Sequence, residues 1–237
     1  MNSKYSKLLT IILVVAIVIV VILFAFFGYE IYNKYYVEKQ TSDMIDVFES
    51  SIANKVTNVE ENTTTTDDEG FSGNVVAPIL SDEPTTSTGG GSSSSGGGKG
   101  TSSGVKYKGY TMVGQIEIPK INIKYPILGQ TTKTSIEVAV SVLYGPGPNK
   151  VGNTVIVGHN YKNGTFFSNN KKLAVGDEIY ITDTEGQRMK YIIFDTQLLA
   201  PEDFDYAVRD TQGKREISLS TCTDDVNSRL VIFAREA

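Results

Sequence analysis

The chain has 237 residues and a net charge of −5, and its second part, residues 105–237, carries 16 basic and 15 acidic side chains. A near-neutral region without a run of Lys or Arg lacks the basic face that nucleic acid requires, so we expect no nucleic-acid partner. The single Cys and the single His exclude an intrachain disulfide and a zinc cage of about four such ligands.

An apolar segment lies near the start of the chain. Leu8–Phe27 are 20 consecutive uncharged residues, and at about 1.5 Å per residue a helix of this length crosses a bilayer core of about 30 Å. The run is longer than the apolar region of a signal peptide and lacks a small-x-small cleavage site. Lys4 and Lys7 precede it, and acidic residues dominate the segment after it. By the positive-inside rule we expect a cytoplasmic N-terminus (1–7), a transmembrane helix (8–28) and a single-pass protein in the cell membrane, with the rest of the chain extracellular.

Two segments of different composition come after the apolar run. Residues 29–56 place apolar side chains at helical spacing, which predicts a juxtamembrane helix. Residues 57–104 are rich in Thr, Ser, Gly and acidic residues and include an uninterrupted Gly/Ser run over residues 89–98. That composition is typical of a flexible linker, whose r.m.s. reach at this length is roughly 40 Å. We therefore expect the folded domain, residues 105–237, to stand off from the membrane.

The folded domain is predicted to consist mainly of β-strands. Segments rich in β-branched and aromatic residues alternate with turns rich in Gly, Pro, Asn and Asp. The candidate strands are Val113–Ile118, Ile136–Val142, Thr154–Val157, Glu178–Thr182, Lys190–Gln197, Glu216–Ser220 and Leu230–Ala234. Many short strands with little helical periodicity are typical of a closed β-barrel or a sandwich. We expect one helical turn near Phe166–Leu173.

Three residues that could do chemistry lie at the ends of predicted strands. Cys222 and His159 each follow a strand, and Arg229 opens the last one, seven positions after Cys222. Strand ends of a barrel gather at a rim, where side chains distant in sequence can meet. An antiparallel return would bring Arg229 beside Cys222.

This trio would suit acyl transfer. A thiolate is a strong nucleophile that a neighbouring imidazolium or guanidinium stabilises. His159 could move a proton to a leaving amine and from an incoming one, and Arg229 could donate hydrogen bonds to an oxyanion. Each residue also has a structural alternative: a buried small thiol, a hydrogen-bonded surface His, and a solvated Arg at a strand edge. Composition and spacing leave both interpretations open.

Around these residues the sequence resembles the sortase family, the membrane-anchored cysteine transpeptidases of Gram-positive bacteria. The resemblance extends from about Gly114 to the C-terminus and rests on five segments in the family's order. They are Gly114–Ile121 with the following Tyr125–Ile127, Gly152–Asn160 around His159, Leu173–Ile179 with its Gly-Asp turn, Leu219–Cys222 as the Leu-x-Thr-Cys signature, and Ser228–Val231 with Arg229.

The resemblance implies an eight-stranded sortase-type β-barrel with short helices over residues 105–237. It implies that Cys222 attacks the Thr carbonyl of a Leu-Pro-x-Thr-Gly-like (LPxTG-like) sorting signal and forms a thioacyl intermediate. His159 would then be the general acid and base, and Arg229 would bind the substrate or the oxyanion. Thr221, next to the nucleophile, would help to shape the substrate groove.

The resemblance also implies partners and a subclass. The partners would be surface proteins that bear LPxTG-like signals, an amine acceptor on peptidoglycan or a pilin, and the membrane through the N-terminal helix. No cofactor or metal is expected, and calcium dependence is left open. An Asp-Pro-aromatic lid and a second C-terminal anchor, usual in pilin-polymerising members, are not found. The short spacings around Cys222 favour a class D-like enzyme, with class B-like second, and residues 199–215 would form the loop that helps to select the sorting motif.

Two alternatives remain beside the transpeptidase hypothesis. In the first, water resolves the thioacyl intermediate, and the protein is a cysteine endopeptidase with the same site residues. In the second, the tethered β-domain is not catalytic and binds a surface partner, in which case Cys222 is inert. The sortase resemblance favours catalysis because the unique Cys, the unique His and the candidate Arg all fall on matching motif positions.

Overall fold

The computed structural model describes residues 3–59 and 104–237, and it divides between Ser42 and Asp43 into two compact units. Helix α1 (Ser3–Val59) contributes to both units. Most of the predicted linker, residues 57–104, lies outside the described residues.

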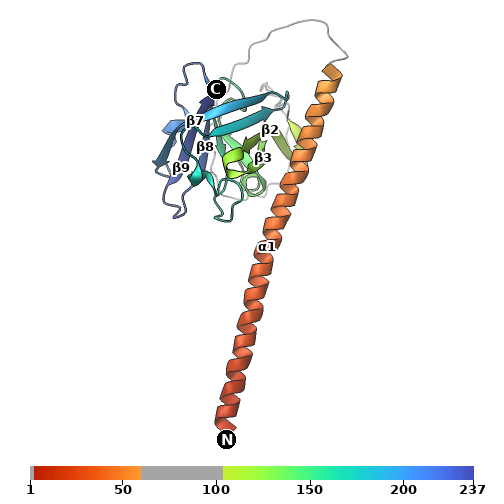
Figure 1. The fold of residues 1–237 in the computed structure, drawn as a ribbon, viewed down its shortest axis with the longest axis vertical. Helices are drawn as coiled ribbons and strands as arrows, with labels where there is room; N and C mark the ends of the chain where they lie inside the picture. Colours follow the sequence, from red (N-terminus) through yellow and green to blue (C-terminus); the bar gives the residue numbers. More distant parts are fainter. Residues whose placement is uncertain (1–2, 60–103) are drawn as a thin grey trace, which may run out of the picture. The chain divides into compact units, whose positions relative to one another are not determined.

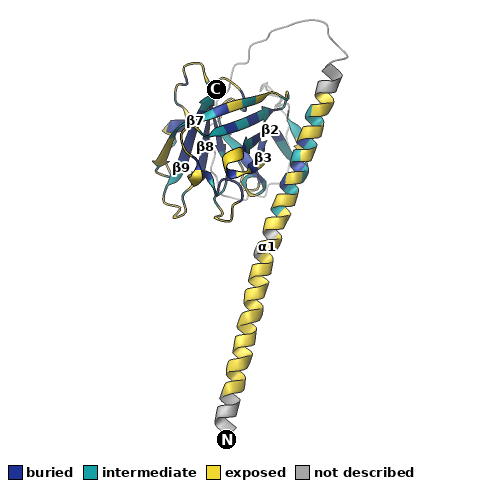
Figure 2. Cartoon of the chain, viewed as in Figure 1, coloured by how far each residue is buried: buried dark blue, intermediate teal, exposed yellow. Residues whose placement is uncertain are grey.

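The first unit consists of the N-terminal part of α1. Its apolar side chains from Leu9 to Phe27 are exposed, as the yellow stretch of α1 in Figure 2 shows. Within the described ranges, α1 is the one helix that is long and apolar enough to cross a membrane, with a mean hydropathy of 3.5. A continuous exposed apolar surface of this kind is consistent with a membrane anchor.

The second unit is built around a closed β-barrel (Figure 1). Eight strands are hydrogen-bonded in the order β2-β3-β4-β5-β8-β9-β7-β6, and β6 pairs with β2 to close the ring, while β1 adds to the outer edge of β2. The strands are β1 (Val105–Tyr107), β2 (Tyr110–Ile118), β3 (Ile123–Leu128), β4 (Val140–Tyr144), β5 (Gly152–Val157), β6 (Glu178–Asp183), β7 (Arg188–Leu199), β8 (Arg215–Cys222) and β9 (Arg229–Glu236). The mainly β fold and the eight-stranded barrel are confirmed, and the sandwich is excluded.

Short helical turns connect the strands: η1 (Pro119–Ile121), α2 (Ser135–Val138), η2 (Asn170–Lys172) and η3 (Asp205–Ala207). The predicted strand Ile136–Val142 is therefore wrong in its first half, which forms α2. The physical reason is local hydrogen bonding: the Ser135 hydroxyl donates to the Gln130 carbonyl, and the Ser135 amide donates to the Thr132 hydroxyl. Such side-chain bonds to the backbone compete with an extended conformation.

The barrel core is formed by alternate residues of the strands, because successive side chains of a strand point to opposite faces. Strands β5, β8 and β9 are buried over most of their length, since their second face is also covered. The covering residues include Tyr206 and Ala207, which pack against Val155, Val231 and Phe233. These three strands are also those that carry the candidate site.

The C-terminal part of α1 belongs to the barrel unit. Met44 and Phe48, four residues apart on one helix face, are almost fully buried against Met112, Leu128 and Ala139. Two polar contacts accompany this packing: the Tyr107 hydroxyl donates to Asp43, and Lys124 pairs with Glu49. The barrel thus has a helical cover formed by a segment that precedes it in sequence by about 50 residues.

Candidate active site

Cys222 is the last residue of β8, and it is exposed with a free thiol. Strand β8 ends there because Thr223 begins a tight loop, in which the Thr223 amide donates to the Ser228 carbonyl. The thiol is therefore fixed at its base by a barrel strand and open to solvent at its tip. This arrangement gives a nucleophile both a defined position and access for a substrate.

His159 follows β5, and its neighbours on either side, Gly158 and Asn160, are hydrogen-bonded to β8. Strands β5 and β8 are parallel, so their C-terminal ends reach the same rim. Before the imidazole, the Gly158 amide donates to the Ser220 carbonyl over 3.3 Å. After it, the Asn160 side-chain amide donates to the Cys222 carbonyl over 3.0 Å. The fold therefore brings His159 and Cys222 to one place.

Arg229 is the first residue of β9 and the direct cross-strand partner of Cys222. Its Nε donates a hydrogen bond of 2.9 Å to the Pro201 carbonyl, and its guanidinium lies over the Phe204 ring at 5.4 Å from the centroid. The Nε bond fixes the plane of the guanidinium, so its terminal nitrogens are the donors that a substrate oxygen would meet.

Thr221 is buried, and its hydroxyl donates to the Gly158 carbonyl over 2.8 Å. This bond joins the strand of the thiol to the segment of the imidazole. The predicted contribution of Thr221 to a substrate groove stays a prediction, and the observed bond adds a role in holding the two strand ends together.

The electrostatics around His159 favour a neutral imidazole. Burial lowers the pKa of His159 below its ordinary value of 6.5, and the carboxylate of Glu137 raises it in part. The Tyr161 ring stacks on the imidazole with centroids 4.7 Å apart. Because the charged form is disfavoured by desolvation, His159 at neutral pH can accept a proton from a thiol or an incoming amine.

The sequence analysis missed a group of polar side chains that lies next to His159 and Cys222. Asn160 also donates to the Asp224 carboxylate over 2.9 Å, and Lys171 pairs with the same carboxylate at 2.6 Å. The hydrogen bonds from Lys171 and Asn160 lower the pKa of Asp224. The position of Asn160, directly after the only His, was a signal in the sequence for a role at the site. Its hydrogen-bonding partners could not be identified, because they lie more than 60 residues further along the chain.

Within residues 3–59 and 104–237, no group of three or more His, Cys, Asp or Glu side chains is arranged to hold a metal ion. The side chains that the fold gathers at this rim are a thiol, an imidazole and a guanidinium. Whether the protein uses a cofactor or calcium stays at the level of the prediction.

Comparison with known proteins gives one family. The family model described as "Sortase domain" matches residues 116–237. The chain is 29% identical to sortase A of Bacillus anthracis over 124 residues, which cover 51% of this chain and 58% of that protein. It therefore spans less than two thirds of that relative.

Solved structures of sortases are also similar to this chain. A lid mutant of sortase A from Corynebacterium diphtheriae has a TM-score of 0.50 and 30% identity, covering 54% of this chain and 71% of that one. A Clostridium perfringens sortase D5 transpeptidase has a TM-score of 0.49 and 28% identity, covering 54% of this chain and 79% of that one.

Proposed function

The chain belongs to the sortase family, whose model covers residues 116–237, and from this premise we propose that it is a cysteine transpeptidase acting on LPxTG-like sorting signals. In its first step His159 takes the thiol proton while the Cys222 sulfur attacks the carbonyl carbon of the Thr in the signal. The Thr–Gly bond breaks, His159 gives a proton to the leaving Gly amine, and the Thr acyl group stays on sulfur as a thioester.

The second step reverses the proton transfer. An incoming amine attacks the thioester carbonyl and its proton passes to His159. The carbon–sulfur bond breaks, and His159 returns the proton to the Cys222 sulfur. In both steps negative charge develops on the carbonyl oxygen, and Arg229 stabilises it with hydrogen bonds from its terminal nitrogens. The acceptor is an amine of peptidoglycan or of a pilin.

The observation that carries this proposal is the meeting of three strand ends at one rim. Cys222 and Arg229 are cross-strand partners, and Asn160, the neighbour of His159, is bonded to the Cys222 carbonyl. A nucleophile, a proton carrier and an oxyanion donor within reach of one another are what acyl transfer requires. The exposure of the thiol supports access by a peptide.

Location and subclass form part of the same proposal. The apolar N-terminal part of α1 spans the cell membrane with residues 1–7 in the cytoplasm and the barrel outside. The enzyme is class D-like rather than class B-like: the connection between β7 and β8 holds only the turn η3, and so it has no long helical insertion.

The test uses the full chain in detergent micelles and a panel of LPxTG-like peptides, with and without triglycine as the amine. Mass spectrometry should detect cleavage between Thr and Gly and a product joined to triglycine. Cys222→Ala should give neither product. Cleavage without capture of the amine would indicate the endopeptidase, and equal behaviour of Cys222→Ala and the wild type would exclude catalysis by this thiol.

A further inference from the structure

The loop between β7 and β8, residues 200–214, runs back along one face of β8. Alternate residues of a strand share a face, so Glu216, Ser218 and Ser220 lie on the same face as Cys222. These three polar residues are 2%, 0% and 1% exposed. Buried polar side chains need hydrogen-bonding partners, and this row finds them in the loop and in a neighbouring strand.

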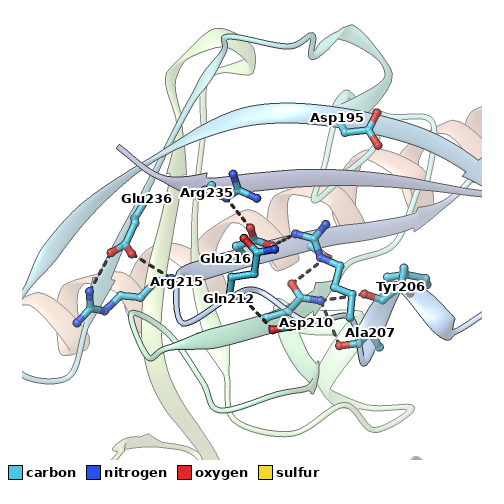
Figure 3. A network of polar contacts seen from close by, with 12 residues as sticks. Asp195, Tyr206, Ala207, Asp210, Gln212, Arg215, Glu216, Arg235 and Glu236 are labelled. Carbon is cyan, nitrogen blue, oxygen red and sulfur yellow. Dashed lines mark hydrogen bonds and ion pairs between the residues drawn. The ribbon is translucent and has the colours of Figure 1, made fainter.

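The middle of the loop is held by hydrogen bonds. The Tyr206 hydroxyl donates to the Ser220 hydroxyl over 3.2 Å. The Ser218 hydroxyl donates to the side-chain oxygen Oδ1 of Asn153 over 2.9 Å, and the side-chain nitrogen Nδ2 of Asn153 is in turn a donor. This nitrogen donates to the main-chain carbonyls of Tyr206 and Ala207, at 3.0 and 3.2 Å. Figure 3 shows Tyr206 and Ala207 of this turn with the hydrogen bonds that their carbonyls accept.

The far end of the loop is held by a buried ion pair. Glu216 faces two guanidinium groups: one carboxylate oxygen accepts from Arg235 Nε over 2.6 Å (Figure 3), and the other pairs with Arg209. Arg235 is the cross-strand partner of Glu216 on β9, whereas Arg209 comes from the loop. Both guanidinium groups also lie over the Phe194 ring, at 5.1 Å for Arg209 and 4.7 Å for Arg235.

The near end of the loop meets the candidate catalytic Arg. The Pro201 carbonyl accepts from Arg229 Nε, and Phe204 lies under the same guanidinium. The loop therefore connects a buried carboxylate at one end of β8 to the group that faces Cys222 at the other. Without the far-end ion pair the loop keeps only its middle bonds and these two contacts with Arg229, and a shift of the loop would move both contacts.

We propose that Arg209, paired with Glu216, is a positioning residue that fixes the 200–214 loop along β8 and thereby orients Arg229 for catalysis. The proposal rests on the proposed function. Arg209 itself touches neither the thiol nor a substrate, and it acts through Pro201 and Phe204. A small displacement of an oxyanion donor lowers turnover strongly because the donor must meet the developing charge directly.

The experiment compares Arg209→Met with Arg235→Met in the full chain in detergent micelles. Each variant removes one guanidinium from Glu216, leaves the other in place, and removes one cation from the Phe194 ring, while Arg209→Met also removes the contact of Arg209 with the Phe233 ring at 4.7 Å. Only Arg209→Met releases the loop, because Arg235 lies within the barrel. Steady-state kinetics with a turned-over LPxTG-like peptide and triglycine gives kcat and KM, and hydrogen exchange read by mass spectrometry gives the protection of residues 200–214.

For Arg209→Met we expect kcat to fall by about tenfold or more with a smaller change in KM, together with faster amide exchange in the loop. For Arg235→Met we expect kcat and loop exchange close to those of the wild type. Wild-type kcat and loop exchange in Arg209→Met would overturn the proposal. Equal losses of kcat in both variants would also overturn the proposal, because the loss would then come from the missing positive charge beside Glu216 and not from release of the loop.

The two proposals can fail separately. If the wild type turns over no peptide, the proposed function fails, and the exchange of residues 200–214 still decides whether Arg209 holds the loop. If the wild type is active and both variants exchange alike, the positioning role fails while the transpeptidase stands.

Discussion

His159 is the single histidine of the chain, so one imidazole signal in an NMR titration reports on the candidate catalytic base. Burial lowers its pKa from 6.5, and Glu137 opposes that shift. We predict a titration midpoint below 6.5 in the wild type, and a still lower midpoint in Glu137→Gln. A midpoint above 6.5 would contradict the lowered pKa of His159.

The same pKa shift predicts how stability depends on pH. The folded-state pKa of His159 lies below its unfolded value, so the unfolded chain binds the proton more tightly. The stability associated with the neutral imidazole is then fully present above about pH 6.5 and is lost as the pH falls toward the folded-state pKa. His159→Gln, which cannot titrate, serves as the control. Its melting temperature should approach that of the wild type as the pH falls through this window.

Arg229 offers a second test at the residue scale. In Arg229→Lys a single ammonium replaces a planar guanidinium that donates Nε to the Pro201 carbonyl and lies over Phe204. The tetrahedral donors of one ammonium cannot reproduce the planar fork that bonds the Pro201 carbonyl and faces an oxyanion at the same time. We expect kcat to fall by about 10² to 10³ with the fold retained, measured by kinetics and circular dichroism. Near-normal turnover would remove Arg229 from the oxyanion role.

At the scale of elements, the C-terminal part of α1 contributes to the stability of the barrel unit. Phe48 is 1% exposed and packs with Met44 against the barrel residues Met112 and Leu128. Phe48→Ala removes this contact and leaves a cavity, so we expect the free energy of unfolding to fall by about 3–5 kcal/mol.

The matched control is Glu49→Ala, the next residue on the same helix. It loses only an exposed ion pair with Lys124, worth about 0–1 kcal/mol. Urea unfolding of the full chain, followed by far-UV circular dichroism, measures both variants. Equal small losses would show that the helix does not stabilise the barrel.

Element prediction from the sequence succeeds where local patterns decide the structure. Polar and apolar residues alternate over residues 216–220, and residues 230–234 form a continuous apolar run rich in β-branched and aromatic side chains. Both patterns predict strands, and the two segments lie within β8 and β9. The sequence analysis did not predict strand β3. Pro126 lies within this strand, and a Pro ordinarily argues against a strand. Local hydrogen bonds of Ser135 turn the start of another predicted strand into α2.

For the candidate site, the sequence predicts which residues lie at strand ends but not how they are held there. Strand boundaries can be read from local composition, so Cys222, His159 and Arg229 could be selected. The bond from Asn160 to Cys222 and the bond from Arg229 to Pro201 join residues 62 and 28 positions apart. Such contacts depend on the strand order of the closed barrel, and the parallel pairing of β5 with β8 is set by tertiary packing.

At the scale of the whole molecule, the apolar part of α1 separates a short basic N-terminal segment from a more acidic segment. Lys4 and Lys7 precede the apolar part of α1, and Glu30 and Glu38 come after it. By the positive-inside rule we predict that this segment spans the membrane with its N-terminus in the cytoplasm. Because Cys222 is the only Cys and its thiol is exposed, this orientation can be tested without adding a label to the barrel.

We predict that a membrane-impermeant maleimide labels the wild-type chain on intact Gram-positive cells and fails to label Cys222→Ala. A second variant, Ser3→Cys in the Cys222→Ala background, moves the thiol to the other end of the span. It should be labelled only after the membrane is permeabilised. Labelling of Ser3→Cys on intact cells, with protection of Cys222 in the wild type, would reverse the topology. It would also put the barrel in the cytoplasm, where no surface protein or cell-wall amine could reach the thiol.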